Sequence, residues 1–211
     1  MEIIEFEHPV ARDILTGLRD RTTNSADFRM QARRLALMLA VETTRYLPTE
    51  PVQVETPLEA TLGERLVEQP VLVPIMRAGM GMLEAFQIFL PGAPVGFVAL
   101  RRDEETAEPI WFYRSLPDVR DRRMLILDPM LATGGTAEEV LADLFDRGAD
   151  SAWLVCAVAA PEGISRLGHF DDLTIVTVSV DRELDEDWFI RPGLGDFGDR
   201  LYDGEPGNGQ G

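Results

Sequence analysis

The sequence predicts an α/β fold with a mainly parallel central sheet that is covered by helices on both faces. Short apolar runs alternate along the chain with segments whose apolar residues recur at helical spacing. Such alternation is typical of parallel strands joined by crossover helices, and strands buried on both faces are continuously hydrophobic. Hydrophobic residues make up 45% of the 211 residues, so the chain can bury a substantial core. We expect one domain over residues 1–203.

The expected strands are apolar runs that stop at polar or turn-forming residues. The clearest covers residues 123–127, because Asp128 follows this run directly. Residues 71–75 form a similar run that passes into Arg-Ala-Gly-Met-Gly, as a buried strand does where it enters a glycine turn. Further strands are expected at residues 94–100, 152–158 and 173–180.

The expected helices begin at capping residues and end at proline or glycine. The longest covers residues 25–47, with Ser25 or Asn24 as its cap and Pro48 after its end. Shorter helices are expected at residues 82–89, at 136–147 before Gly148, and at 161–167.

Two segments do not fit this alternation. Residues 101–117 are first charged and then aromatic, and Pro117 bounds them, so we expect a hairpin that extends from the sheet as a flap. Residues 204–211 are polar and glycine-rich, and we expect a disordered tail there.

The charge balance excludes some classes of partner. Asp and Glu number 37 against 20 bases, all of them arginine, which gives a net charge of −17. Such a surface repels nucleic acid backbones and anionic membranes, so we expect neither as a partner. One hypothesis for the excess acid is a cytoplasm of high ionic strength, where salt screens self-repulsion. An ordinary acidic protein is the alternative.

The remaining composition points to a cytoplasmic protein without a metal cluster. The first residues lack the basic and apolar regions of a signal peptide, and no run approaches the length of a membrane span. With two histidines and one cysteine, a His/Cys metal site is disfavoured. Cys156 lies in an apolar run and is expected to be a small buried hydrophobic residue.

The chemistry centres on the segment that follows the strand at 123–127. Asp128 is expected at the carboxyl edge of the sheet, where ligands of such folds bind. Ala132-Thr-Gly-Gly-Thr136 then opens a helix, whose free N–H groups and dipole can bind a phosphate without lysine. A carboxylate just before such a loop can hold sugar hydroxyls, so the pair is typical of a ribose-phosphate site.

Two other phosphate-binding motifs do not match this segment. The G-x-G-x-x-G spacing of dinucleotide-binding proteins is absent, and no Gly-Lys-Ser/Thr of a P-loop follows. A simple Gly-Gly turn capped by threonine, with Asp128 satisfied locally, remains the structural alternative.

Several motifs, in order along almost the whole chain, resemble those of the uracil phosphoribosyltransferases, which have a type I phosphoribosyltransferase fold. The segment 128–136 is similar to their loop for 5-phosphoribosyl diphosphate (PRPP). Pro74-Ile-Met-Arg-Ala-Gly79 resembles the family's Pro-Ile-Leu-Arg-Ala-Gly, and Arg102-Asp-Glu-Glu-Thr106 resembles its Arg-Asn-Glu-Glu-Thr. Ala159-Ala-Pro-Glu-Gly163 matches without change, and Phe189-Ile-Arg-Pro-Gly-Leu-Gly-Asp-Phe-Gly-Asp199 resembles the base-binding segment near the family's C-terminus.

The resemblance implies transfer of the phosphoribosyl group of PRPP to uracil, which gives uridine monophosphate (UMP) and diphosphate. Residues 182–202 would form a base-binding hood, and the catalytic residues would be Asp128, Arg102 and Asp196. Uracil would contact Ile190, Gly195, Asp196 and Phe197. PRPP would contact Arg77, Arg102, Asp128, Pro129, Met130, Leu131, Ala132, Thr133, Gly134, Gly135, Thr136 and Asp196.

The resemblance also implies a cofactor and an assembly. Mg²⁺ would be bound mainly through PRPP, and no direct protein ligand is assigned to it. A homodimer or a higher homo-oligomer is expected, and a GTP effector is left open.

This sequence departs from the family pattern at a few positions. Phe197 stands where the family has a small alanine, and Arg191 replaces an apolar residue. The flap lacks a lysine that the family often has, and Arg114, beside Ser115, is a candidate substitute. Two alternatives to a uracil enzyme therefore remain, a transferase for another nucleobase and a non-catalytic sensor of PRPP or a nucleotide.

Overall fold

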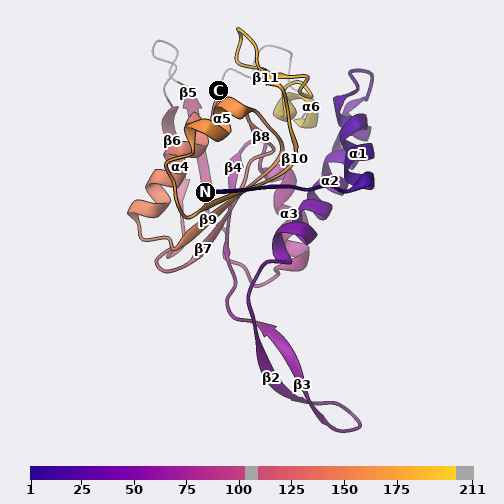
Figure 1. Ribbon diagram of the computed structural model, residues 1–211, viewed down its shortest axis with the longest axis vertical. Helices are drawn as coiled ribbons and strands as arrows, with labels where there is room; N and C mark the ends of the chain where they lie inside the picture. Colours follow the sequence, from indigo (N-terminus) through magenta and orange to yellow (C-terminus); the bar gives the residue numbers. More distant parts are fainter. Residues whose placement is uncertain (103–108, 203–211) are drawn as a thin grey trace.

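The computed structural model describes residues 1–102 and 109–202, apart from the side chains of 101, 102 and 109 (Figure 1). Its centre is one large sheet with strand order β1-β10-β9-β7-β4-β5-β6, and β8 pairs with β9. Every pairing in this sheet is parallel except that of β5 with β6. The strands are β1 (Glu2–Glu5), β4 (Val71–Met76), β5 (Phe97–Arg102), β6 (Pro109–Ser115), β7 (Arg123–Leu127), β8 (Met130–Leu131), β9 (Ser151–Ala159) and β10 (Leu173–Val180).

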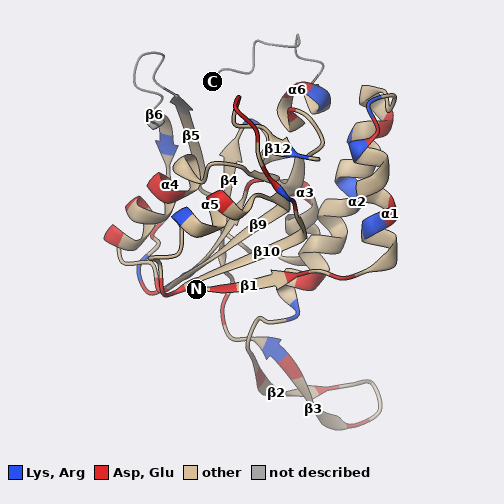
Figure 2. Ribbon diagram, turned by 45° about the horizontal axis from the view of Figure 1, so that its top comes forward, with Lys and Arg blue, Asp and Glu red and all other residues tan. Residues whose placement is uncertain are grey.

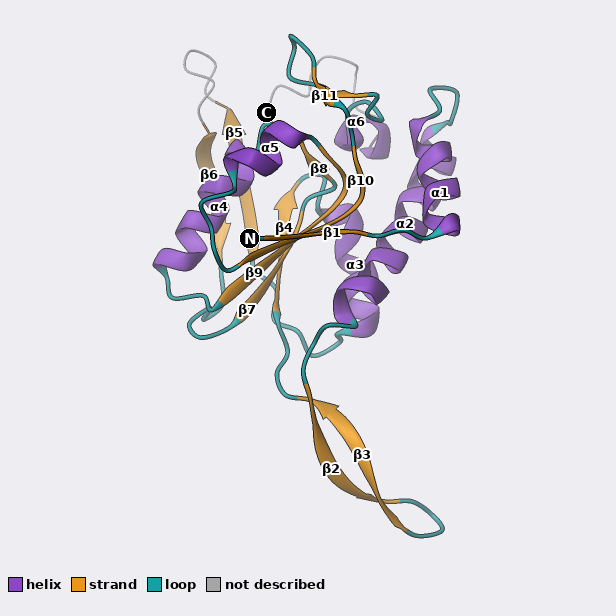
Figure 3. Ribbon diagram, in the orientation of Figure 1, coloured by secondary structure: helices purple, strands orange, loops and turns teal. Residues whose placement is uncertain are grey.

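Helices cover both faces of this sheet, which confirms the predicted fold class (Figure 3). Successive residues of a strand point to opposite faces. Leu72 and Leu125 accordingly pack with one apolar cluster, whereas Val73 and Met124 pack with the other. The first cluster includes residues of α1 (Pro9–Arg19), α2 (Ser25–Thr44), α3 (Met80–Phe89) and α6 (Phe197–Tyr202), and the second those of α4 (Gly135–Asp146) and α5 (Pro161–Arg166).

The predicted elements differ from the structure mainly at their ends. The strands at 123–127 and 173–180 have the predicted bounds. The long helix ends at Thr44 instead of 47, and Asn24 is its cap, with its side chain accepting from the N–H of Asp27. β5 starts at Phe97 instead of 94, because Val95 makes only an isolated bridge to Leu72.

Several elements were not predicted. β1 and α1 precede the long helix, and α1 begins with Pro9 after His8, whose Nδ1 accepts from the N–H of Val10. A hairpin of β2 (Thr49–Glu55) and β3 (Ala60–Leu66) projects from the body of the protein (Figure 1). Most of its side chains are exposed, so it lacks the buried face whose alternation would reveal a strand.

The predicted flap is an antiparallel hairpin. β5 pairs with β6, and both strands belong to the main sheet. At its base, Arg114 forms an ion pair with Asp143 of α4, and its guanidinium lies 5.1 Å from the ring centroid of Trp111. Arg114 therefore ties the hairpin to α4. Residues 103–108 of the flap and the predicted tail lie outside the described residues.

Acidic side chains are spread over the molecule, including β1, the β2–β3 hairpin and the loop between β11 (Glu183–Leu184) and β12 (Ile190–Arg191) (Figure 2). None of the helices in the described part of the chain is both long and apolar enough to cross a membrane.

Candidate active site

The predicted site residues gather at the carboxyl edge of the parallel sheet. Arg77 follows β4, Asp128 follows β7, and β4 and β7 are neighbours with Pro74 opposite Leu127. The chain leaving β10 forms β11, β12 and α6, which lie over this same edge (Figure 3). One edge of the sheet thus assembles three segments that are far apart in the sequence.

The 128–136 segment is held by close backbone packing. Gly134 has a φ of 79°, and a Cβ added there would lie 2.9 Å from the carbonyl oxygen of Gly163. A Cβ on Gly163 would lie only 2.3 Å from the carbonyl oxygen of Ala132. Both glycines are therefore required for α5 to support the loop.

The predicted loop at 129–135 is partly regular. Met130 and Leu131 form β8, and α4 begins at Gly135, one residue earlier than predicted. Because Gly134 is the cap of α4, no cap side chain accepts from the first-turn N–H groups. The positive end of α4 thus opens at the predicted phosphate position.

Asp128 is a partly buried carboxylate at the start of this segment. Burial raises its pKa to about 7, against a weak opposing hydrogen bond from the N–H of Met130. That bond is 3.5 Å long, so it compensates only weakly for the burial of the Asp128 carboxylate. Its carboxyl group is destabilised in its charged form and would gain from a cation or from hydroxyl donors.

The turn that contains Arg77 packs tightly on the end of β7, directly before Asp128. A Cβ on Gly79 would be 2.1 Å from the carbonyl oxygen of Leu127, so only glycine fits there. The Arg77 side chain is 65% exposed, and its Nη2 lies 3.6 Å from Oδ1 of Asp199. The hydroxyl of Tyr202 donates to the carbonyl oxygen of Arg77 at 3.3 Å. Both partners belong to α6.

The 190–197 segment carries the predicted base contacts. Ile190 is buried, whereas Gly195, with a φ of 80°, and Asp196 are exposed. Asp196 caps α6, since its Oδ1 accepts from the N–H of Asp199 at 2.7 Å. The structure thus gives Asp196 a local capping contact, which agrees with the Asx turn that is the structural alternative for this residue.

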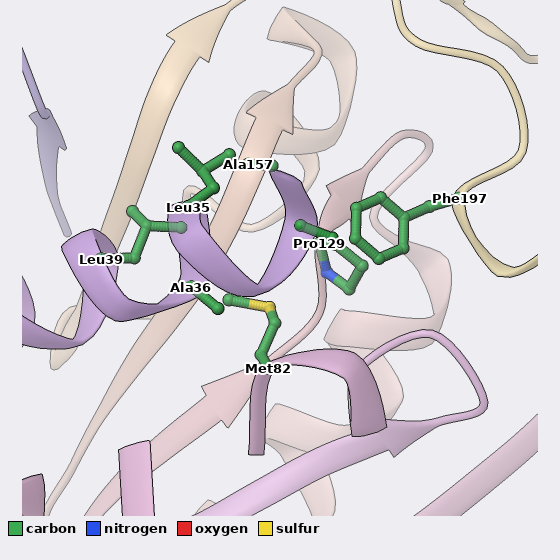
Figure 4. A pocket seen from close by; sticks show the side chains of 8 residues that line it. Leu35, Ala36, Leu39, Met82, Pro129, Ala157 and Phe197 are labelled. Carbon is green, nitrogen blue, oxygen red and sulfur yellow. The ribbon is translucent and has the colours of Figure 1, made fainter. Parts of the chain in front are cut away.

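The ring of Phe197 points into the protein interior. It lines a small apolar pocket near Pro129, together with Leu35 and Met82 (Figure 4). It also meets the ring of Phe28 edge-on at a centroid distance of 5.2 Å. The side chain is therefore part of the core.

Two predicted or candidate positions have a different setting. The backbone of Arg102 lies in β5 opposite Pro109, and its side chain is outside the described part of the structure. Arg191 forms an ion pair with Asp185, which brackets the β11–β12 turn. Arg191 therefore contributes to the shape of the hood.

The sequence analysis missed the side chains that hold the hood. Arg19 of α1 and Asp181, just after β10, form an ion pair at 2.6 Å that touches the 190–197 segment. The guanidinium of Arg200 donates to the carbonyl oxygen of Leu194 at 2.7 Å, and the carboxylate of Glu162 accepts from the N–H of Leu184 at 3.0 Å. The sequence offered no signal for Arg19, Asp181 and Arg200, which lie outside the motifs described above. Glu162 lies in the segment 159–163 that resembles the family, but no role was predicted for it.

The donor set suits a hard cation that takes most ligands from a substrate. Among residues 1–102 and 109–202, no group of three or more His, Cys, Asp or Glu side chains could enclose a metal ion. Asp128 and Asp196 nevertheless supply carboxylate oxygens, which Mg²⁺ prefers. These residues fit Mg²⁺ bound with few protein ligands.

This arrangement can bind a phosphorylated sugar with a second anionic group. The α4 N-terminus suits one phosphate, Asp128 suits sugar hydroxyls, and Arg77 suits a further anion. Solved structures with such a fold include a purine phosphoribosyltransferase from Pyrococcus horikoshii (TM-score 0.50, 18% identity, 74% of this chain and 94% of that chain). The fold is that of the phosphoribosyltransferases, and at this identity the likeness concerns the fold alone.

Closer relatives narrow the class. The family model for uracil phosphoribosyltransferase matches residues 5–204, so the chain belongs to the uracil phosphoribosyltransferase family. A uracil phosphoribosyltransferase of Arthrobacter sp. is 45% identical over 96% of this chain and 98% of its own length. One of Beutenbergia cavernae is 46% identical over 96% and 99%. The AQ2163 protein of Aquifex aeolicus has a TM-score of 0.89 and 37% identity, covering 95% of this chain and 97% of that one.

Proposed function

We propose that this protein transfers the phosphoribosyl group of PRPP to uracil, which yields UMP and diphosphate for pyrimidine salvage. The observation that carries the proposal is the meeting of Asp128, the Arg77 turn and the 190–197 segment at one sheet edge, within a chain of this family. A phosphate site, a carboxylate and a base segment are the parts that this reaction requires.

PRPP binds along the edge from α4 to the Arg77 turn. The N–H groups of residues 132–136 hold the 5′-phosphate, with hydroxyls of Thr133 and Thr136 as additional donors. Asp128 accepts from the ribose hydroxyls, and its elevated pKa means that a neighbouring cation favours the charged form. Pro129, Met130 and Leu131 shape the floor between these groups.

Two arginines answer the charge that develops on the leaving diphosphate. As the bond from the anomeric carbon breaks, negative charge grows on the diphosphate and positive charge on the sugar. Arg77 and Arg102 stabilise the diphosphate and cannot lose their protons. The exposed guanidinium of Arg77 can leave Asp199 for this anion because their separation is already 3.6 Å.

Uracil is held mostly by backbone groups of the hood. Gly195 and the peptide groups of Asp196 and Phe197 supply donors and acceptors to the edge of the base, with Ile190 beside them. Since the Phe197 ring packs inside the protein, it does not narrow the base site. The geometry therefore supplies no reason to prefer another nucleobase over uracil.

Mg²⁺ is the expected cofactor, bound mainly through PRPP, with Asp128 and Asp196 at its periphery. When bound, it supplies charge neutralisation for the departing diphosphate. The flap, 101–117, would exclude water that could hydrolyse the activated sugar. Asp128, Arg102 and Asp196 are thus the proposed catalytic residues.

The rest of the proposal concerns the assembly. Residues 1–203 would act as one domain, as a homodimer or higher homo-oligomer in the cytoplasm. A GTP effector is a further possibility raised by the family resemblance alone, and sedimentation with and without GTP would test it.

The test is direct formation of UMP. Purified protein is mixed with PRPP, Mg²⁺ and labelled uracil at low and high KCl, beside cytosine, hypoxanthine and orotate. The proposal expects UMP from uracil alone, with product lost in Arg77→Ala. Tight PRPP binding without any product would identify a sensor, and product from a different base would identify another transferase.

A further inference from the structure

Both backbone polar groups of Gly193 form hydrogen bonds with side chains of other elements. Its N–H donates to Oδ2 of Asp181 at 2.9 Å, and its carbonyl oxygen accepts from Nη1 of Arg19 at 2.9 Å. Gly193 has a φ of 61°, and a Cβ there would lie 2.1 Å from the carbonyl oxygen of Ile190. The turn that leads into the base segment is therefore fixed by two side chains from other elements.

These two side chains also bind each other. Arg19 donates to Asp181 through both terminal nitrogens, at 2.8 and 2.6 Å. The Asp181 side chain is 2% exposed, and Ser179 donates to it at 2.9 Å. Burial alone would raise the pKa of Asp181, but hydrogen bonds from Arg19, Gly193 and Ser179 hold this pKa below its ordinary value. Asp181 is thus a charged, fully engaged group in the interior.

A second arginine holds the next residue of the same turn. Arg200 donates to the carbonyl oxygens of Leu194 and Asp20, both at 2.7 Å, and to that of Leu18. Leu18 and Asp20 lie at the C-terminal end of α1, where free carbonyl groups favour a cation. Arg19 belongs to the same turn of α1. Hence α1 is connected to residues 193 and 194 through two separate guanidinium groups.

This support matters because the neighbouring base contacts are made by backbone. Gly195 and Asp196 are exposed and follow Leu194 directly, so their peptide groups have little packing of their own. A backbone site recognises its ligand only if the chain is kept in place before binding. Arg19 and Asp181 lie behind Gly193, and neither is among the proposed uracil contacts.

We propose that Arg19 and Asp181 are positioning residues for uracil. They clamp the backbone of Gly193, so that the backbone of residues 195–197 is preorganised for the base. The clamp rests on the proposed function, because it assigns a purpose to the same base segment. When the clamp is opened, affinity for uracil should fall by a larger factor than affinity for PRPP, which contacts this segment only through Asp196.

The experiment uses Asp181→Asn in the full chain, with two readouts. The KM for uracil is expected to rise at least about tenfold, the loss that follows when a charged hydrogen bond is weakened. The PRPP dissociation constant and kcat should change by a smaller factor, because Asp196 is the one residue of this segment that is assigned to PRPP and to catalysis. Amide hydrogen exchange without any substrate should become faster in residues 190–197 and stay unchanged in residues 128–136.

A matched control separates positioning from general loss of stability. Ile14→Ala removes a buried side chain of α1, one turn before Leu18, and leaves every clamp contact in place. It should lower the melting temperature with no change in the KM for uracil. Arg19→Lys, which keeps the charge but loses the forked geometry, serves if Asp181→Asn does not fold, and it should cause a smaller rise in KM.

The outcomes separate the clamp from the function. An unchanged KM for uracil in a folded Asp181→Asn, or an equal rise in Ile14→Ala, overturns the clamp. Unchanged exchange in residues 190–197 overturns it as well, whether or not the protein turns over uracil. Wild-type protein without turnover of uracil contradicts the proposed function instead, and exchange then still decides whether the clamp holds the segment.

Discussion

The 128–136 segment and the 190–197 segment face the same site, but they are held in different ways. The first is held by its own backbone, where glycines allow carbonyl groups of α5 and the loop to approach closely. The second is held by charged side chains of Arg19, Asp181 and Arg200, which come from α1, the end of β10 and α6. Substitutions that loosen the first segment should therefore weaken mainly the binding of PRPP, and those that loosen the second should weaken mainly the binding of uracil.

The largest effect is expected from a methyl group at Gly163. In Gly163→Ala the new Cβ would lie 2.3 Å from the carbonyl oxygen of Ala132, so the loop must move. A misplacement on the order of 1 Å reduces kcat/KM for PRPP by about 100-fold. Gly92→Ala, whose Cβ meets only the side chain of Gln69, is the control and should leave kinetics unchanged. Normal PRPP kinetics in Gly163→Ala would show that the loop tolerates displacement.

Asp128→Asn should separate activity from stability. Loss of a charged acceptor for the ribose should lower kcat/KM by about 10- to 100-fold. The pKa of Asp128 is about 7 in the folded protein against an ordinary 3.8. Between these pH values the Asp128 carboxyl binds more protons in the folded state than in the unfolded state. Its contribution to the free energy of unfolding therefore falls as pH rises and is constant above about pH 7.

The variant lacks this titration. The melting temperature of Asp128→Asn minus that of wild type should therefore be larger at pH 8 than at pH 4, as measured by calorimetry. If this difference is instead smaller at pH 8 than at pH 4, the raised pKa of Asp128 is contradicted. Asp146→Asn, at an exposed position of α4, is the control for removal of one acid.

The sequence revealed one of these two segments better than the other. Asp128 and the two glycines that follow are contiguous, and a carboxylate before a glycine-opened helix has a direct chemical meaning. Arg19 and Asp181 are 162 residues apart, and their meeting depends on how α1 packs beside β10. No local pattern encodes such a contact, so the hood's supports emerged only from the structure.

The fold shows the same division. Buried strands such as 123–127 were predicted because burial on both faces gives a continuous apolar run. The β2–β3 hairpin was missed because its side chains are largely exposed, with Leu58 at its tip 94% exposed. The direction of the Phe197 ring could not be predicted either, since it depends on the space beside Phe28 of α2.

Phe197→Ala should affect stability more than chemistry. The ring is 4% exposed in the core, and its removal should cost about 3–5 kcal/mol of unfolding free energy. Denaturant unfolding measures this loss, and kinetics at a temperature where the variant is folded should still show a preference for uracil. Phe197→Leu, which keeps most of the volume, should lose less stability. Unchanged stability with altered base preference would instead make the ring a determinant of specificity.

The smallest effect is expected from salt. With a net charge of −17, self-repulsion opposes the compact state, and KCl screens it. The melting temperature should rise with KCl, and sucrose at equal osmolality controls for solvent exclusion. A melting temperature that does not rise would reject the hypothesis of a high-salt cytoplasm.

The central claim is that the two segments serve two substrates. The most direct measurement is the PRPP dissociation constant and the KM for uracil, determined side by side for Gly163→Ala and Asp181→Asn. In Gly163→Ala the PRPP dissociation constant should rise with little change in the KM for uracil, whereas in Asp181→Asn the KM for uracil should rise by the larger factor. Equal losses for both substrates in both variants would contradict it.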